Sequence, residues 1–260
     1  MQRVFFNFQG NAVFAVLAFV GTAVGLFLLA TAMVLAITAG RRRATRWAAM
    51  AGGGWIAAYA ALLIESSARS RPQIAGVGEE KYFCEVDCHL AYSVIGVRRE
   101  KVPGASRGDS DGRRAFTLVT LRTRFDETTI SPHRGNGPLT PNGRRIAVVD
   151  ARGRQYAPSG GEPTGPSTGL MTMLLPGQSY TTTLVFELPH DIRSPRLLLT
   201  EDAWVTRLLI GHENSFGHEK TLFLMEESPP RGLAPHSTRT SAFPVPILPV
   251  ALSRTLTTTR

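Results

Sequence analysis

Two long uncharged stretches near the N-terminus constrain this chain more than any other feature. Residues 11–39 carry no charged side chain, and neither do residues 47–64. A bilayer core of about 30 Å is crossed by about 20 apolar residues in a helix that rises about 1.5 Å per residue. The sequence therefore predicts a membrane hairpin, with a tail at 1–10, spanning helices at 11–39 and 47–65, and a loop at 40–46.

Four arginines in the connecting loop predict how the hairpin is oriented. Arg41, Arg42, Arg43 and Arg46 lie between the two uncharged stretches, whereas the N-terminal tail has only Arg3. Positive residues in short loops stay preferentially in the cytoplasm. We therefore expect a two-pass protein of the cytoplasmic membrane with both termini outside. The alternative is that these arginines reflect composition bias and that the rest of the chain is cytoplasmic.

Glycines within the two stretches predict close helix packing. Gly21 and Gly25 form a small-xxx-small pair, and Gly52–Gly54 interrupts the second stretch. Small residues let helices approach each other in lipid, so we expect these glycines to lie between the two helices. Residues 11–39 and 47–64 contain no charged residue, which does not favour a transporter or a channel.

The charge distribution argues against a nucleic-acid partner despite a net charge of +9. Five of the 29 basic residues precede Glu65, and all 20 acidic residues lie at or after it. The rest of the chain has a surplus of only four positive charges, which is ordinary for a solvated surface. The expected partners are the lipid bilayer and another protein or polymer of the cell envelope.

The chain beyond the hairpin has the pattern of a β domain. We divide it into a linker at 66–80, a domain at 81–228 and a disordered tail at 229–260, which is rich in Pro, Ser, Thr and Arg. Apolar and polar residues alternate from Tyr82 to Val94, which is typical of a strand. About eight short strands are separated by turn signals, and one of them is predicted at 204–210. The series predicts an all-β antiparallel Ig-like sandwich.

The order of four segments carries a resemblance to a known class of domain. The segments are a strand at Phe116–Leu121, a hairpin at Val148–Tyr156, a turn at Leu175–Gln178 and a strand at Thr183–Pro189. Residues 81–226 thereby resemble the uncharacterised bacterial Ig-like extracytoplasmic domains that are often carried on membrane anchors. The resemblance implies a sandwich and an envelope location, and it implies no reaction. The long loop at 126–143 and the cysteine pair depart from that pattern.

Cys84, Cys88 and His89 form the sequence cluster with possible chemistry, and three interpretations remain open. The cysteines form a disulfide in an oxidising compartment, they are buried unreactive thiols, or they bind Cu(I) or zinc together with His89. An extended strand separates residues i and i+4 by about 13 Å. Bridged cysteines need Cα atoms within about 7 Å, so a disulfide requires a turn between them.

The same cluster invites comparison with subunit II of the haem–copper oxidases, which also has two helices followed by an outward β domain. That subunit carries Cys-x3-Cys-x3-His-x2-Met as its copper-binding motif. Tyr92 and Ile95 occupy the positions of the last two ligands here, so the resemblance lacks half of the motif.

A second histidine group, His212-x5-His218 with Glu213 and Glu219, would bind a metal only if its loop folded back. A solvated hairpin loop is the other interpretation. The chain has no Gly-x-Ser-x-Gly motif, and no glycine-rich phosphate loop precedes a helix.

We therefore expect no catalytic residues. The predicted function is a non-enzymatic interaction or structural module of the cell envelope, without a cofactor. The alternative is a copper- or redox-handling accessory protein that uses Cys84, Cys88 and His89, with copper or zinc as the bound metal.

Overall fold

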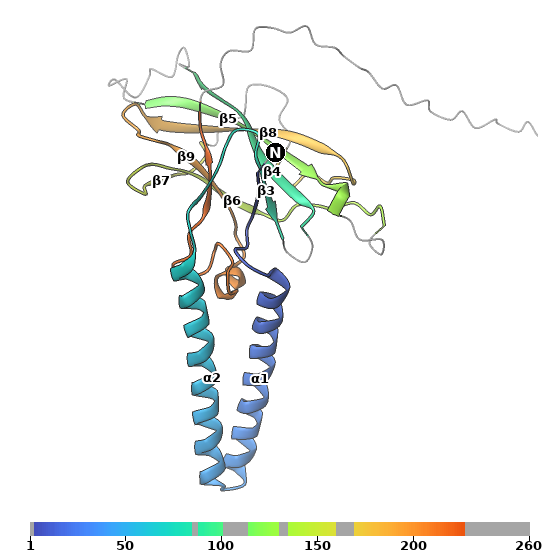
Figure 1. Cartoon of the computed structure of the whole chain (residues 1–260), viewed down its shortest axis with the longest axis vertical. Helices are drawn as coiled ribbons and strands as arrows, with labels where there is room; N and C mark the ends of the chain where they lie inside the picture. Colours follow the sequence, from blue (N-terminus) through green and yellow to red (C-terminus); the bar gives the residue numbers. More distant parts are fainter. Residues whose placement is uncertain (1–2, 85–87, 101–113, 130–134, 160–168, 227–260) are drawn as a thin grey trace, which may run out of the picture. The chain divides into compact units, whose positions relative to one another are not determined.

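The computed structural model describes residues 3–84, 88–100, 114–129, 135–159 and 169–226 (Figure 1). The predicted tail at 229–260 lies outside the described residues.

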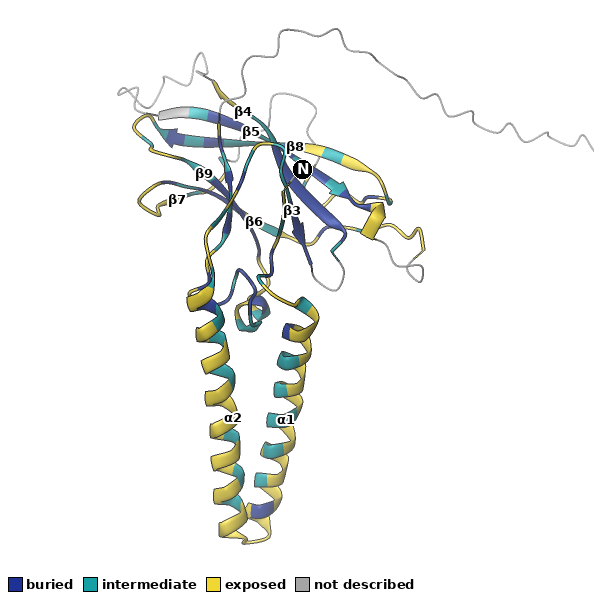
Figure 2. Ribbon diagram, in the orientation of Figure 1, coloured by how far each residue is buried: buried dark blue, intermediate teal, exposed yellow. Residues whose placement is uncertain are grey.

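Two long helices occupy the predicted hairpin. Helix α1 spans Ala12–Thr38 and helix α2 spans Arg42–Arg69. Within the described residues, both are long and apolar enough to cross a membrane. Their side chains are mostly exposed, as Figure 2 shows, and the buried residues of these two helices are Ala15, Ala36 and Ser67. A core helix of a water-soluble protein would instead be largely buried.

The ends of the helices differ from the predicted boundaries. Asn11 caps α1, because its side-chain oxygen accepts a hydrogen bond from the Phe14 amide at 3.1 Å. Helix α2 begins at Arg42 and ends at Arg69, beyond the predicted 47–65 at both ends. The first turn of α2 therefore carries positive charge, which the helix dipole disfavours. The arginines in the first turn of α2 therefore do not stabilise the helix.

One glycine packs the two helices together. A Cβ added at Gly25 would lie 3.0 Å from the Trp55 ring, and the Trp55 indole nitrogen donates to Thr22 Oγ1 at 3.3 Å. The prediction is confirmed for Gly25. It is wrong for Gly21 and Gly52–Gly54, where a Cβ would meet nothing within 4 Å.

In the part of the chain that the structure describes, the β domain consists of two sheets. The first has the order β1-β3-β4-β5-β8 and the second the order β2-β10-β9-β6-β7. The strands of the first sheet are β1 (Val4–Phe6), β3 (Glu80–Phe83), β4 (Leu90–Glu100), β5 (Arg114–Phe125) and β8 (Ser179–Pro189). Those of the second are β2 (Gln73–Ala75), β6 (Arg144–Val149), β7 (Gln155–Tyr156), β9 (Arg196–Glu201) and β10 (Thr221–Leu224).

Both sheets are mixed, so the prediction of a purely antiparallel domain is wrong. Strand β1 pairs in parallel with β3, and β2 pairs in parallel with β10. The reason is the hairpin: β1 leads into α1 and β2 follows α2, so the direction of each strand is set by the helix beside it. These two strands occupy the segments that were predicted as a tail at 1–10 and a linker at 66–80.

Side chains from both sheets form one hydrophobic core. Tyr92, Phe125 and Phe186 contribute from the first sheet, and Leu199 and Phe223 contribute from the second. All five are almost fully buried. Burying such side chains stabilises a fold by about 1.5–3 kcal/mol each, so this core is the main source of stability for the domain.

Two predicted strands take another form. The alternating stretch from Tyr82 to Val94 is divided into β3 and β4, which pair as an antiparallel hairpin. Residues 204–210 were predicted as a strand, but Trp204–Leu208 forms the 3₁₀ helix η3. A second short 3₁₀ helix, η2, spans Glu127–Thr129.

Candidate functional site

The two cysteines are joined in a disulfide at the end of the β3–β4 hairpin. Their Cα atoms lie 4.1 Å apart, so Cys84 and Cys88 do not lie on one extended strand. Strand β3 ends at Phe83 and β4 begins at Leu90, which places the bridge where the chain reverses. The disulfide interpretation is confirmed and the interpretation as free thiols is wrong. Residues 85–87 lie outside the described part of the chain.

His89 contacts Thr129 and Phe125. Its Nδ1 atom lies 2.5 Å from Thr129 Oγ1, and its ring stacks on Phe125 with centroids 5.6 Å apart. Among the described residues, no group of three or more Cys, His, Asp or Glu side chains is arranged to hold a metal ion. The cluster therefore does not come together as the predicted ligand set.

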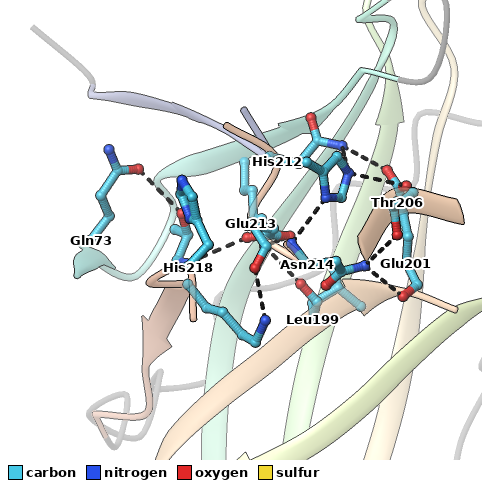
Figure 3. A network of polar contacts seen from close by, with 12 residues as sticks. Gln73, Leu199, Glu201, Thr206, His212, Glu213, Asn214 and His218 are labelled. Atoms are coloured by element: carbon cyan, nitrogen blue, oxygen red, sulfur yellow. Dashed lines mark hydrogen bonds and ion pairs between the residues drawn. The ribbon is translucent and has the colours of Figure 1, made fainter. Parts of the chain in front are cut away.

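A buried polar cluster that the sequence did not reveal contacts the backbone of Cys84 through Asn7. Figure 3 shows part of this cluster. We define the polar cluster as Asn7, Lys81, Glu201, Thr206, His212, Glu213 and Asn214. Its members come from the residue that follows β1, from β3, β9 and η3, and from the loop that follows η3. The cluster thus connects the chain just before α1 with both sheets.

Lys81 joins the two sheets through the centre of the polar cluster. Its ammonium group donates to Glu213 Oε1 at 2.7 Å and to the Leu199 carbonyl at 2.7 Å, and the side chain is fully buried. The ammonium also lies 4.7 Å from the centroid of the Phe83 ring. Burial lowers the pKa of Lys81, while the nearby Glu213 carboxylate opposes that shift.

Glu201 contacts two side chains that are far apart in the sequence. The Asn7 amide nitrogen donates to Glu201 Oε1 at 2.6 Å, and His212 Nε2 lies 3.3 Å from Glu201 Oε2. His212 Nδ1 accepts the backbone N–H of Asn214 at 2.9 Å. His212 Nε2 lies 3.3 Å from the Asn7 amide nitrogen as well, so Asn7, Glu201 and His212 contact one another. Asn7 also accepts the backbone N–H of Cys84 at 2.9 Å, which ties the disulfide to the polar cluster.

The loop from Gly211 to Glu219 is not the solvated hairpin loop that was predicted. His212, Glu213 and His218 are buried. His218 Nδ1 donates to the Glu219 carbonyl at 2.8 Å, and burial lowers the pKa of His218. The two histidines therefore have different roles: His212 belongs to the polar cluster, whereas His218 bonds to its neighbour along the chain.

Two cavities adjoin the polar cluster. One has a volume of about 310 Å³ and is lined by Arg145, Arg207 and Lys220 together with Asp202 and Phe216. The other has a volume of about 400 Å³, and its lining includes Phe8, Cys84, Val205 and Leu209. The first cavity concentrates positive side chains, and the second is mainly apolar.

A second polar group lies on β3 and β5. The Arg124 guanidinium donates to Glu80 Oε2 at 2.7 Å and to Asp126 Oδ2 at 3.1 Å, and the Tyr82 hydroxyl also donates to Asp126. Burial works against the charged form of Asp126, but the hydrogen bonds from Tyr82, Thr128 and Arg124 outweigh it. The pKa of Asp126 therefore lies below its usual value.

Comparisons with known proteins do not assign a family to this chain. It matches no known sequence family, and no curated protein matches it. Two solved structures are similar at a low level. The secreted protein MPT63 of Mycobacterium tuberculosis is 13% identical, with a TM-score of 0.38, and the match covers 59% of this chain and 98% of that chain. A functionally unknown protein of Listeria monocytogenes EGD-e is 11% identical, with a TM-score of 0.29, and the match covers 44% and 66%.

Proposed function

We propose that this chain is a membrane-anchored protein whose β domain acts outside the cytoplasmic membrane as a non-enzymatic interaction or structural module of the cell envelope. The observation that carries this proposal is how the helices join the domain. Strand β1 precedes α1 at the edge of one sheet, and β2 follows α2 at the edge of the other. The anchor is thus built into the domain and is not a flexible tether.

The side of the membrane is proposed from two independent features. The arginines Arg41, Arg42, Arg43 and Arg46 favour a cytoplasmic position for the tip of the hairpin. Cys84 and Cys88 form a disulfide, and disulfides form and persist in oxidising compartments. Both features support an extracytoplasmic domain, and the single core between two sheets supports its interpretation as an Ig-like sandwich.

An exposed apolar segment is the proposed contact for another protein or polymer of the envelope. Met171 and Met173 are 62% and 60% exposed, and Leu175 is also exposed. Neighbouring exposed apolar side chains often mark interaction sites, and methionine adapts to differently shaped partners. A photoreactive residue at Met173 should crosslink to a partner in intact cells. The same residue at Ile37, near the cytoplasmic end of α1, is the control and should not give that product.

Reporter fusions test the proposed location. Alkaline phosphatase fused to the C-terminus should be active, and green fluorescent protein at the same position should stay dark. Replacing the four arginines with alanine should weaken this preference, whereas replacing Arg152 and Arg154 in the β domain should leave it unchanged. Fluorescence of the wild-type fusion without phosphatase activity would place the domain in the cytoplasm and refute the proposal.

A further inference from the structure

The segment that follows β9 runs along helix α2. The contacts between them form a series in which later residues of the segment meet later residues of the helix. The Leu208 carbonyl accepts from the Tyr59 hydroxyl at 2.7 Å, a Cβ at Gly211 would lie 3.6 Å from Ser66 Oγ, and the Glu219 amide donates to Ser70 Oγ at 2.9 Å. Of these three contacts, the one made by Leu208 lies farthest from Arg69, where α2 ends and the chain enters the β domain.

The position of Tyr59 places this segment beside the apolar part of the helix. Glu65 is the first charged residue after the uncharged stretch of α2, and Tyr59 lies six residues before it. Six residues correspond to about 9 Å along a helix axis. On the side of α1, Leu209 packs in a small apolar cluster with Ala12 and Ala15. Figure 1 shows η3, in orange, between the domain-side ends of the two helices.

Several backbone carbonyls of this segment accept hydrogen bonds from within the protein, as a low-water environment favours. The Leu208 carbonyl accepts from Tyr59, and the Leu209 carbonyl accepts from the Ser215 hydroxyl. The Gly211 carbonyl accepts a hydrogen bond from the backbone N–H of Gln9 at 2.8 Å. Irregular backbone is tolerated at membrane depth only when its polar groups are satisfied in this way.

The side chains of the segment suit a membrane interface. Trp204 is 71% exposed and Phe216 is 68% exposed. Tryptophan is enriched at the boundary between lipid and water. Arg207 is the charged residue of η3, and it lines the 310 Å³ cavity together with Asp202 and Lys220. Phe216 lines the same cavity, so one of the two exposed aromatic side chains lies beside the charged ones.

We propose that residues 203–211, together with Phe216, form a third membrane contact, seated in the leaflet on the side of the β domain. Its partner is the glycerol and upper acyl region of phospholipids. This inference rests on the proposed membrane anchor but does not depend on which side of the membrane the domain occupies. Trp204 and Phe216 contact lipid, and the Tyr59–Leu208 hydrogen bond keeps the segment at its depth.

Fluorescence quenching in lipid nanodiscs tests this contact with the full-length chain. Trp47 and Trp55 are replaced by phenylalanine, so that Trp204 is the only fluorophore of its kind. Lipids brominated near the headgroup end of the acyl chain should quench Trp204 more than lipids brominated near the chain end. Iodide in the aqueous phase should quench it less in nanodiscs than in the urea-unfolded chain.

A matched control places the fluorophore at the far end of the same domain. Phe116→Trp, with all three native tryptophans replaced by phenylalanine, puts indole nine residues from Phe125 on β5, which is about 30 Å along a strand. It should not be quenched by brominated lipid. Equal quenching of Trp204 and of this control would overturn the inference.

A protein that keeps Trp47 and Trp55 but carries Trp204→Phe separates the two proposals. If Trp47 and Trp55 are quenched in this protein but Trp204 is not quenched in the protein that carries it alone, the third contact is refuted and the membrane anchor is still supported. Absence of quenching in both samples would refute the anchor as well.

Discussion

The pairing of Lys81 with Glu213 makes a sharp prediction about stability. Both side chains are almost entirely buried, and their charged atoms are 2.7 Å apart. Lys81→Met leaves a buried carboxylate without its cation, and Glu213→Gln leaves a buried ammonium without its anion. Removing one partner of a buried pair costs about 3–5 kcal/mol. Each single substitution should therefore destabilise the domain by this amount.

The double variant should be less damaged than either single variant. Lys81→Met with Glu213→Gln removes both charges, so no unpaired charge stays buried. The Leu199 carbonyl still loses the hydrogen bond from Lys81, which costs about 1–3 kcal/mol. For a domain of this size, 1 kcal/mol corresponds to about 2–4 °C in Tm. The single variants should lose about 6–20 °C and the double variant only about 2–12 °C.

Thermal unfolding in detergent micelles, followed by near-ultraviolet circular dichroism, measures these shifts. Arg69→Met is the control, because it breaks the solvent-exposed Arg69–Glu65 pair, and such pairs contribute about 0–1 kcal/mol. Additive losses in the double variant would show that Lys81 and Glu213 do not interact. Single variants that behave like Arg69→Met would refute the reasoning altogether.

Three further predictions concern other parts of the chain. Replacing Cys84 and Cys88 with serine should cost about 2 kcal/mol, the value for closing a loop of this length, and lower Tm in non-reducing buffer. Asp126→Asn should flatten the loss of Tm in acid: the folded-state pKa is lowered, so the stability from Asp126 is complete above about pH 4 and is lost as pH falls through the folded-state pKa. Gly25→Leu should push Trp55 away and widen the separation of the helices, measured between spin labels.

Each of these predictions has its own control. Dithiothreitol should lower the Tm of the wild type and leave the cysteine-free protein unchanged. Asp191→Asn, in the turn after β8, should leave the acid profile as in the wild type. Gly21→Leu should not change the helix separation, because a Cβ there meets nothing within 4 Å. A widening at Gly21 equal to that at Gly25 would contradict the proposed packing.

The helices and most of the strands could be predicted because their signals are local. An uncharged run of about 20 residues is long enough to identify a spanning helix, as for residues 11–39. Strands β5 and β8 have eleven or more residues and alternate clearly. By contrast, β1 and β2 have three residues each, and their pairing is decided by partners more than 70 residues away. No local pattern identifies such strands.

The polar cluster was missed for a different reason. Lys81 and Glu213 are residue types that usually lie on the surface, and nothing in their immediate sequence distinguishes a buried copy. Residues 204–210 were mistaken for a strand because an apolar run reads the same whether it enters a sheet or borders a membrane. In both cases the deciding contact comes from a distant part of the chain.

The bond between Gln9 and Arg71 has a consequence for how the domain can be isolated. The Gln9 side chain donates to the Arg71 carbonyl at 2.9 Å and accepts the Arg71 amide at 3.1 Å, so the chain leaves the β domain and re-enters it at neighbouring points. The hairpin is topologically an insertion. Excising it and joining the two points with a short glycine linker should give a water-soluble domain that retains Asn7, whereas a fragment starting after α2 would lack an edge strand.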